Sequence, residues 1–157
     1  MSKQHHYTTT LRWTGNQGTG TSNYKAFERS HTIETNGKPI IHGSSDPSFR
    51  GDPTKYNPEE LFLSSLSSCH MLWYLHLCAV NGVQVTRYTD QAMGTMEESS
   101  DGSGKFTQVM LNPTVVVSKK SMIDKAHELH GQANQKCFIA NSVNFSVQHN
   151  AICQAIQ

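Results

Sequence analysis

One long apolar segment with clear signals at both ends constrains the fold of this chain more than any other feature. Residues 58–80 are rich in Leu, Phe, Met and Trp. Asn57-Pro58 supplies a capping side chain and a proline suited to the first helical position, and Glu59-Glu60 favours the positive end of the helix dipole. Asn81-Gly82 is typical of a helix end. Apolar residues cover much of the circumference, so we expect a central core helix, or one at a seam between subunits.

The segments before this helix predict strands and loops. Residues 7–13 and 24–35 alternate between polar and apolar side chains, and Asn36-Gly37 is a strong hairpin signal. Residues 40–56 carry Gly, Ser, Asp and Pro throughout, which indicates a loop over the body of the protein. Functional side chains often lie on such loops.

The segments after the helix predict a second hairpin, a helix and a last strand. Residues 84–96 and 106–118 alternate and are separated by the Ser- and Gly-rich tip 99–104. We expect Ser121 to cap a helix that runs to about Lys136, and residues 144–152 to form a closing strand. Strands with few helices and no repeated βαβ units indicate an α+β fold.

Composition favours one small soluble domain. With 157 residues and 36% hydrophobic content, residues 1–157 can bury a core as a single domain. A formal net charge of +1 without a basic block argues against nucleic acid or membrane as a partner. The polar start lacks a secretory signal and serines and histidines interrupt the apolar run 61–80, so we expect a cytoplasmic protein whose four cysteines are reduced thiols.

Two cysteines on separate elements are the main chemical feature. Cys69 lies inside the expected long helix, and Cys137 begins a segment far downstream. One thiol on a buried helix and another on a later element can act as nucleophile and resolving partner, the arrangement that thiol-based peroxide chemistry needs.

The sequence around the long helix resembles the OsmC/Ohr family of thiol-dependent peroxidases. The resemblance rests on Asn57-Pro58-Glu59-Glu60-Leu61-Phe62 running to Cys69, on Trp13-Thr14-Gly15 and Gly18-Thr19-Gly20, and on Cys137 in the place of the second cysteine. It implies an α+β fold with antiparallel sheets wrapped around a long central helix. It also implies an intertwined homodimer with two active sites at the interface.

Two positions depart from the family pattern. The family's second cysteine commonly precedes a proline, whereas Phe138 follows Cys137 here. The Ohr branch carries an arginine in its amino-terminal glycine turn, where this chain has Asn16-Gln17. The OsmC branch takes its arginine from the loop before the Asn-Pro-Glu motif, where Arg50 lies, so the chain resembles OsmC more than Ohr.

The chemistry that the resemblance implies needs a positive group beside the reactive thiol. A free thiol is only a few per cent thiolate at neutral pH. We expect Arg50 to stabilise the Cys69 thiolate and to polarise the peroxide, with Glu59 holding its guanidinium. Arg29 or Arg12 could take the place of Arg50.

Helix geometry limits which of these residues can meet. Glu59 and Cys69 are ten positions apart, about 15 Å of rise on a straight helix. Either the helix breaks or, as we predict, Glu59 and Arg50 of one subunit face Cys69 of the other. Cys78 falls on the opposite face from Cys69, and Cys153 has no visible partner, so both are interpreted as packing residues.

The histidines do not form a convincing metal site. His127 and His130 with Cys137, the pair His5-His6, or His70 could be offered as ligands, but none completes a ligand set. We therefore expect no metal and no cofactor other than an external thiol or dithiol reductant.

The predicted function is reduction of organic hydroperoxides, or hydrogen peroxide, through Cys69 and Cys137 in oxidative or osmotic stress defence. The alternative is a dimeric binding module of the same fold that holds a small hydrophobic ligand with little turnover, which Phe138 favours. A hydrolase or acyl transferase acting through Cys69 would need a base. His70 is adjacent in sequence but about 100° away around a helix.

Overall fold

A computed structural model describes residues 3–156 and shows a mixed α+β fold. The chain divides into two compact units, Met1–Leu61 and Phe62–Gln157. Within residues 3–156, no helix combines the length and apolar character needed to cross a membrane.

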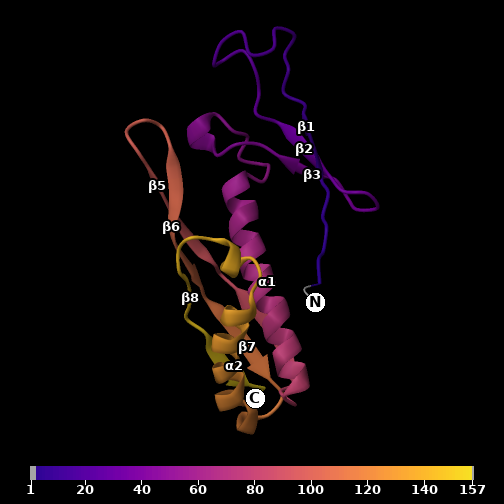
Figure 1. Cartoon of the computed structure of the whole chain (residues 1–157), viewed down its shortest axis with the longest axis vertical. Coiled ribbons are helices and arrows are strands. Elements are labelled where there is room, and N and C mark those ends of the chain that lie inside the picture. The colour runs from indigo at the N-terminus through magenta and orange to yellow at the C-terminus, as the bar shows by residue number, and fades with distance from the viewer. Residues whose placement is uncertain (1–2, 157) are drawn as a thin grey trace. The chain divides into compact units, whose positions relative to one another are not determined.

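The first unit contains a three-stranded antiparallel sheet (Figure 1). Its order is β1 (Thr10–Trp13), β2 (His31–Glu34) and β3 (Ile41–Gly43). Ile33 pairs with apolar residues on both neighbouring strands. Gly37 lies in the β2–β3 turn with φ of 73°, a conformation open to glycine, which confirms the Asn36-Gly37 hairpin.

The long helix α1 (Pro58–Val80) has the predicted bounds. The Asn57 side chain accepts a hydrogen bond from the Glu60 backbone N–H at 2.8 Å, and the Glu60 carboxylate accepts one from the Asn57 N–H at 3.1 Å. This reciprocal capping box satisfies two backbone donors that a helix start leaves free. At the other end Gly82 adopts φ of 71°.

The second unit contains two three-stranded sheets, and each strand of one sheet is adjacent along the chain to a strand of the other. Their orders are β4-β7-β9 and β5-β6-β8. The strands are β4 (Val85–Asp90), β5 (Met93–Glu98), β6 (Gly104–Leu111), β7 (Pro113–Val117), β8 (Val147–His149) and β9 (Ile152–Ala155).

Each long strand expected from the sequence is divided by a short break. The Asp90 carboxylate accepts a hydrogen bond from the Asn112 N–H at 2.7 Å, and the Asn112 side chain donates to the Gln91 carbonyl. The expected hairpin of 84–96 with 106–118 is confirmed in this divided form. The closing strand becomes β8 and β9, which pair in parallel with β6 and β7 and extend to Ala155.

The second helix, α2 (Ile123–Lys136), begins differently from the prediction. Its N-cap is Met122, which makes no side-chain capping bond, so Ser121 as cap is wrong. A short 3-10 turn, η2 (Lys120–Met122), precedes the helix and encloses Ser121. The helix starts without a polar cap, stabilised by the apolar face that it buries.

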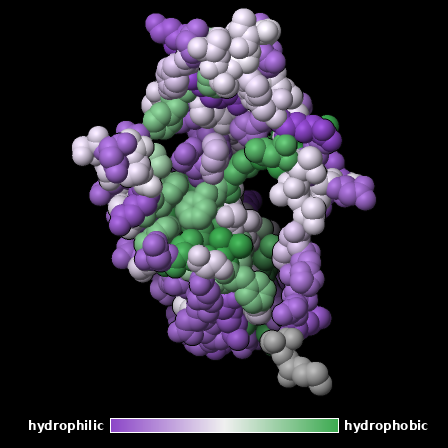
Figure 2. Space-filling view, turned by 45° about the horizontal axis from the view of Figure 1, so that its top comes forward, coloured by the Kyte–Doolittle hydropathy of each residue, from purple (hydrophilic) through white to green (hydrophobic). Residues whose placement is uncertain are grey.

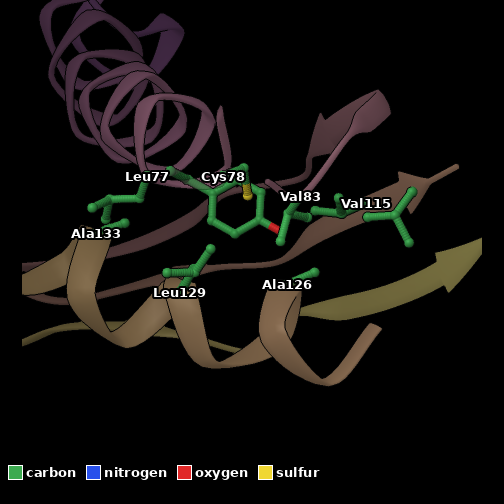
Figure 3. Close-up of a cluster of buried hydrophobic side chains, with 9 residues drawn as sticks. Leu77, Cys78, Val83, Val115, Ala126, Leu129 and Ala133 are labelled. Carbon is green, nitrogen blue, oxygen red and sulfur yellow. The ribbon is translucent and has the colours of Figure 1, made fainter. Parts of the chain in front are cut away.

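The main core of the second unit lies between α1, α2 and the sheet β4-β7-β9. Figure 3 shows side chains of α1 and α2 meeting across this core, with valines of the sheet side beside them. The buried members are Tyr74, Leu77, Cys78, Val83, Val115, Val117, Ala126, Leu129 and Ala133. A second cluster, with Leu66 and Val109 at its centre, fills the space between α1 and β6.

Candidate functional site

The second unit brings Cys69 and Cys137 together. Cys69 is half-buried in the middle of α1, and Cys137 is buried at the C-cap of α2, with 1% of its surface exposed. Burial, followed by hydrogen bonding and charge from the Cys69 side chain, raises the pKa of Cys137 to about 11. The Ala140 N–H donates to the Cys137 sulfur at 3.4 Å. All four cysteines of the chain are free thiols.

An aromatic patch adjoins the two thiols in sequence and in space. Trp73 lies one helical turn after Cys69, and its ring meets Phe138 edge to face at 5.5 Å. Phe138, which replaces the family's proline, is 68% exposed. Leu72, Trp73 and His76 line an open hollow of about 240 Å³. Such a surface can receive the apolar part of a small molecule.

Arg50 lies in the first unit with an unusual backbone conformation. It follows the short 3-10 helix η1 (Pro47–Phe49), and its φ of 65° is the only positive value of a non-glycine residue within residues 3–156. Its N–H donates to the Pro47 carbonyl at 3.0 Å. Backbone strain of this kind is concentrated at functional sites. No side-chain hydrogen bond or ion pair of the described chain involves the Arg50 guanidinium.

The two alternative arginines are already engaged. The Arg29 guanidinium lies over the rings of Tyr24 and Phe27, at 4.5 and 4.2 Å, and donates to the carbonyls of the same two residues. Arg12 pairs with Glu34 at 3.4 Å. Arg29 and Arg50 line one hollow of about 280 Å³ within the first unit, and of the two only Arg50 has a guanidinium without a partner among residues 3–156.

The two glutamates at the start of α1 differ in their surroundings. Glu60 completes the capping box and is exposed. Glu59 has a buried carboxylate oxygen, Oε2, without a hydrogen-bond partner. The ion pairs of the described residues do not include Glu59 with Arg50, so that pairing stays a prediction. Because α1 is continuous, a helix break does not bring Glu59 to Cys69.

The other two cysteines belong to the core. Cys78 is 1% exposed, Cys153 packs against the same cluster, and both lie near the Tyr74 hydroxyl. Burial raises the pKa of each thiol, and burial likewise raises the pKa of Tyr74. Thiols with a raised pKa in apolar surroundings are poor nucleophiles.

A buried histidine pair was not foreseen from the sequence. His70 of α1 and His130 of α2 form a hydrogen bond of 3.0 Å and are almost completely buried. From the sequence, His130 was a candidate only as a metal ligand, and His70 as a metal ligand or as a poorly placed base for Cys69. Within residues 3–156 no group of three or more His, Cys, Asp or Glu side chains is arranged to hold a metal ion. No local pattern could have revealed a pair that is 60 positions apart.

Comparisons with known proteins identify the family. The family model for OsmC-like proteins matches residues 51–151. An OsmC-like protein of unknown function from Vibrio cholerae is 32% identical in sequence. The alignment with its solved structure has a TM-score of 0.84 and covers 95% of this chain and 100% of the Vibrio cholerae chain. No curated protein matches the chain.

More distant structures share the fold. Two proteins named organic hydroperoxide resistance proteins, from Elizabethkingia anophelis and Legionella pneumophila, each have 17% identity and a TM-score of 0.67. Each alignment covers 98% of this chain and 100% of the other. At this identity the likeness establishes a common architecture.

Proposed function

Because the chain belongs to the family of OsmC-like proteins, we propose that it is a thiol-dependent peroxidase. It reduces organic hydroperoxides, or hydrogen peroxide, with Cys69 as the reactive thiol and Cys137 as the resolving thiol. The observation that carries this proposal is the close approach of these two side chains within the second unit.

Burial and protonation support the division of roles between the two thiols. Cys69 is partly accessible, whereas Cys137 is buried and its pKa is raised to about 11. At neutral pH Cys137 is therefore a protonated thiol and a weak nucleophile. Oxidation of Cys69 to an uncharged sulfenic acid removes a negative neighbour and favours the Cys137 thiolate for the second step.

The reaction balances with one peroxide and two thiols. The Cys69 sulfur attacks the distal peroxide oxygen, an S–O bond forms, the O–O bond breaks, and the alkoxide leaves as the alcohol after taking a proton. The Cys137 sulfur then attacks Cys69, and a disulfide forms as water leaves. An external dithiol reduces the disulfide, so the cycle requires no bound cofactor. The cytoplasm, which four unpaired cysteines favour, contains such reductants.

The remaining residues complete the site across a homodimer in this proposal. Arg50 has a free guanidinium and Glu59 has an unsatisfied carboxylate oxygen, so both can take a partner from another chain. Arg50 of one subunit would stabilise the Cys69 thiolate of the other. Exposed apolar side chains support association of two chains, and Figure 2 shows apolar residues gathered over a broad area in the middle of the view.

Intact mass after one equivalent of cumene hydroperoxide tests the proposal. We expect wild type to lose about two mass units and Cys137→Ser to accumulate a sulfenic acid on Cys69. Peroxide consumption with a dithiol reductant should be absent in Cys69→Ser. Cys153→Ser, which also alters a half-buried thiol, is the matched control and should keep wild-type turnover.

Two results would contradict the peroxidase. One is an unchanged wild-type mass after peroxide, and the other is full consumption by Cys69→Ser. Binding of a hydrophobic ligand that survives Cys69→Ser, without any turnover in wild type, would instead identify a binding module.

A further inference from the structure

The buried histidine pair joins the two helices that carry the proposed redox thiols. The His70 and His130 rings are stacked with an interplanar angle of 6° and centroids 5.3 Å apart, and His70 Nε2 lies 3.0 Å from His130 Nδ1. Their exposed fractions are 1% and 0%. The Tyr74 ring covers His130 at 3.8 Å. Among the hydrogen bonds of residues 3–156, this is the only one that joins a side chain of α1 to a side chain of α2.

The positions of the pair relate it to the thiols. His70 directly follows Cys69 on α1. His130 lies seven residues before Cys137, about two turns of α2, so the two share one side of that helix. A bond between His70 and His130 therefore fixes the spacing of α1 and α2 directly after Cys69 on α1 and about two helical turns before Cys137 on α2.

The hydrogen bond requires the pair to stay neutral. A neutral imidazole has one N–H and one acceptor nitrogen. One ring donates to the other, and the two outer atoms, His70 Nδ1 and His130 Nε2, are buried without partners. A first added proton would place an unpaired charge in the core, and a second would leave no acceptor between the rings.

Among residues 3–156, no carboxylate contributes to the surroundings of the pair to compensate such a charge. The titratable groups that stack on the pair or act on its charge are Tyr74 of α1, His127 of α2 and His149 of β8. Cys78 and Cys153 lie near the Tyr74 hydroxyl. Burial, then the charge of His149, lowers the pKa of His70 to about 4. Burial, then the charges of His70, His149 and His127, lowers the pKa of His130 to about 3.

We propose that the neutral His70–His130 hydrogen bond is a positioning pair that holds Cys69 and Cys137 in contact. Protonation of the pair in acid loosens α2 from α1 and slows the disulfide step, in which the Cys137 sulfur displaces hydroxide from the Cys69 sulfenic acid. Attack of Cys69 on the peroxide is not affected. The inference rests on the proposed peroxidase function for its reaction, but the contact between the thiols can be tested without peroxide.

The sign of the pH effect follows from the lowered pKa values. An unpacked histidine titrates near pH 6.5, so above that pH both the packed and the loosened forms are neutral and the contact is kept. As the pH falls below 6.5, the loosened form takes up protons that the packed form does not. The packed form is therefore disfavoured progressively down to the folded pKa values.

A non-titrating amide pair provides the test. In the double variant His70→Gln with His130→Asn, the glutamine amide takes the place of His70 Nε2 and the asparagine oxygen that of His130 Nδ1, so an uncharged hydrogen bond is kept. The measurement is the ratio of Cys69–Cys137 disulfide to dimedone-trapped Cys69 after one equivalent of cumene hydroperoxide, by peptide mass. We expect the wild-type ratio to fall at least about fivefold from pH 7.5 to about pH 5, relative to the amide pair. His42→Gln, a change of an exposed histidine in the first unit, should follow wild type.

Equal ratios in wild type and the amide pair at every pH would overturn the inference. If the double variant does not fold, His130→Asn alone takes its place. Its ratio should fall less than that of wild type, because only one histidine of the pair still titrates, and an equal fall in the two proteins would overturn the inference. A short reagent with two thiol-reactive groups measures the Cys69–Cys137 contact without peroxide. Thiolates become scarcer at low pH in both proteins, so the cross-linked peptide should decline more steeply in wild type than in the amide variant below about pH 6. No Cys69 oxidation at neutral pH would refute the peroxidase, and the cross-linking result would then decide the positioning role.

Discussion

At the scale of single residues, Arg50 and Arg29 show how two similar side chains come to different roles. Arg29 is held by two aromatic rings and two carbonyl groups. Arg50 has a strained backbone, and its guanidinium has no partner among the described residues 3–156. A guanidinium that is already engaged stabilises its own unit, whereas a free one can bind a thiolate or a peroxide oxygen.

We predict that Arg50→Lys lowers kcat/KM for an organic hydroperoxide by about tenfold to a hundredfold, because a lysine cannot offer two parallel N–H groups. Peroxide consumption at several substrate concentrations measures the effect. The matched control is Arg29→Lys, which should lower the free energy of unfolding and leave kcat/KM nearly unchanged. The reverse pattern would assign the role to Arg29.

At the scale of elements, the capping residues Asn57 and Glu60 fix where α1 begins. The reciprocal bonds of Asn57 and Glu60 satisfy backbone donors, while Glu59 keeps an unsatisfied buried oxygen. The two adjacent glutamates therefore have different roles. Glu60 stabilises the start of the helix, and Glu59 is available to the proposed site.

We predict that Asn57→Ala lowers the free energy of unfolding by about 1 kcal/mol, because the α1 start loses its capping oxygen. Urea unfolding measures the loss. Glu60→Gln should have a smaller effect, since glutamine can keep the bond to the Asn57 N–H. Glu59→Gln should reduce peroxide turnover more than it reduces stability. Equal loss of turnover in the two glutamine variants would show that Glu60 has more than a capping role.

At the scale of the whole molecule, the proposed homodimer is what would complete each site. Cys69 and Cys137 lie in the second unit, and Arg50 and Glu59 lie in the first. A shared site across two chains makes activity depend on association, so turnover should be lost on dilution along with the dimer.

Mixed dimers test the shared site. Arg50→Ala and Cys69→Ser should each be inactive alone. After co-refolding in equal amounts, about a quarter of wild-type activity should return, because half of the dimers are mixed and each mixed dimer has one intact site. No recovery, in a sample that contains mixed dimers by native mass spectrometry, would place Arg50 and Cys69 of one site in the same chain.

Local signals determined much of this protein. The helix over 58–80, the Asn36-Gly37 turn and the second hairpin depend on caps, glycine conformations and side-chain alternation within a few residues, and all three are confirmed. The start of α2 was the exception. Ser121 is a good capping residue, but a preceding 3-10 turn encloses it, and burial of the helix face outweighs the missing cap.

The amino-acid sequence by itself determined the elements, the family resemblance and which cysteines were candidates, because these depend on neighbouring residues. Only the tertiary structure decided which distant side chains meet. Cys69 with Cys137, and His70 with His130, approach because α1 and α2 pack on one core. Such contacts arise from the packing of whole elements, which no spacing along the chain specifies.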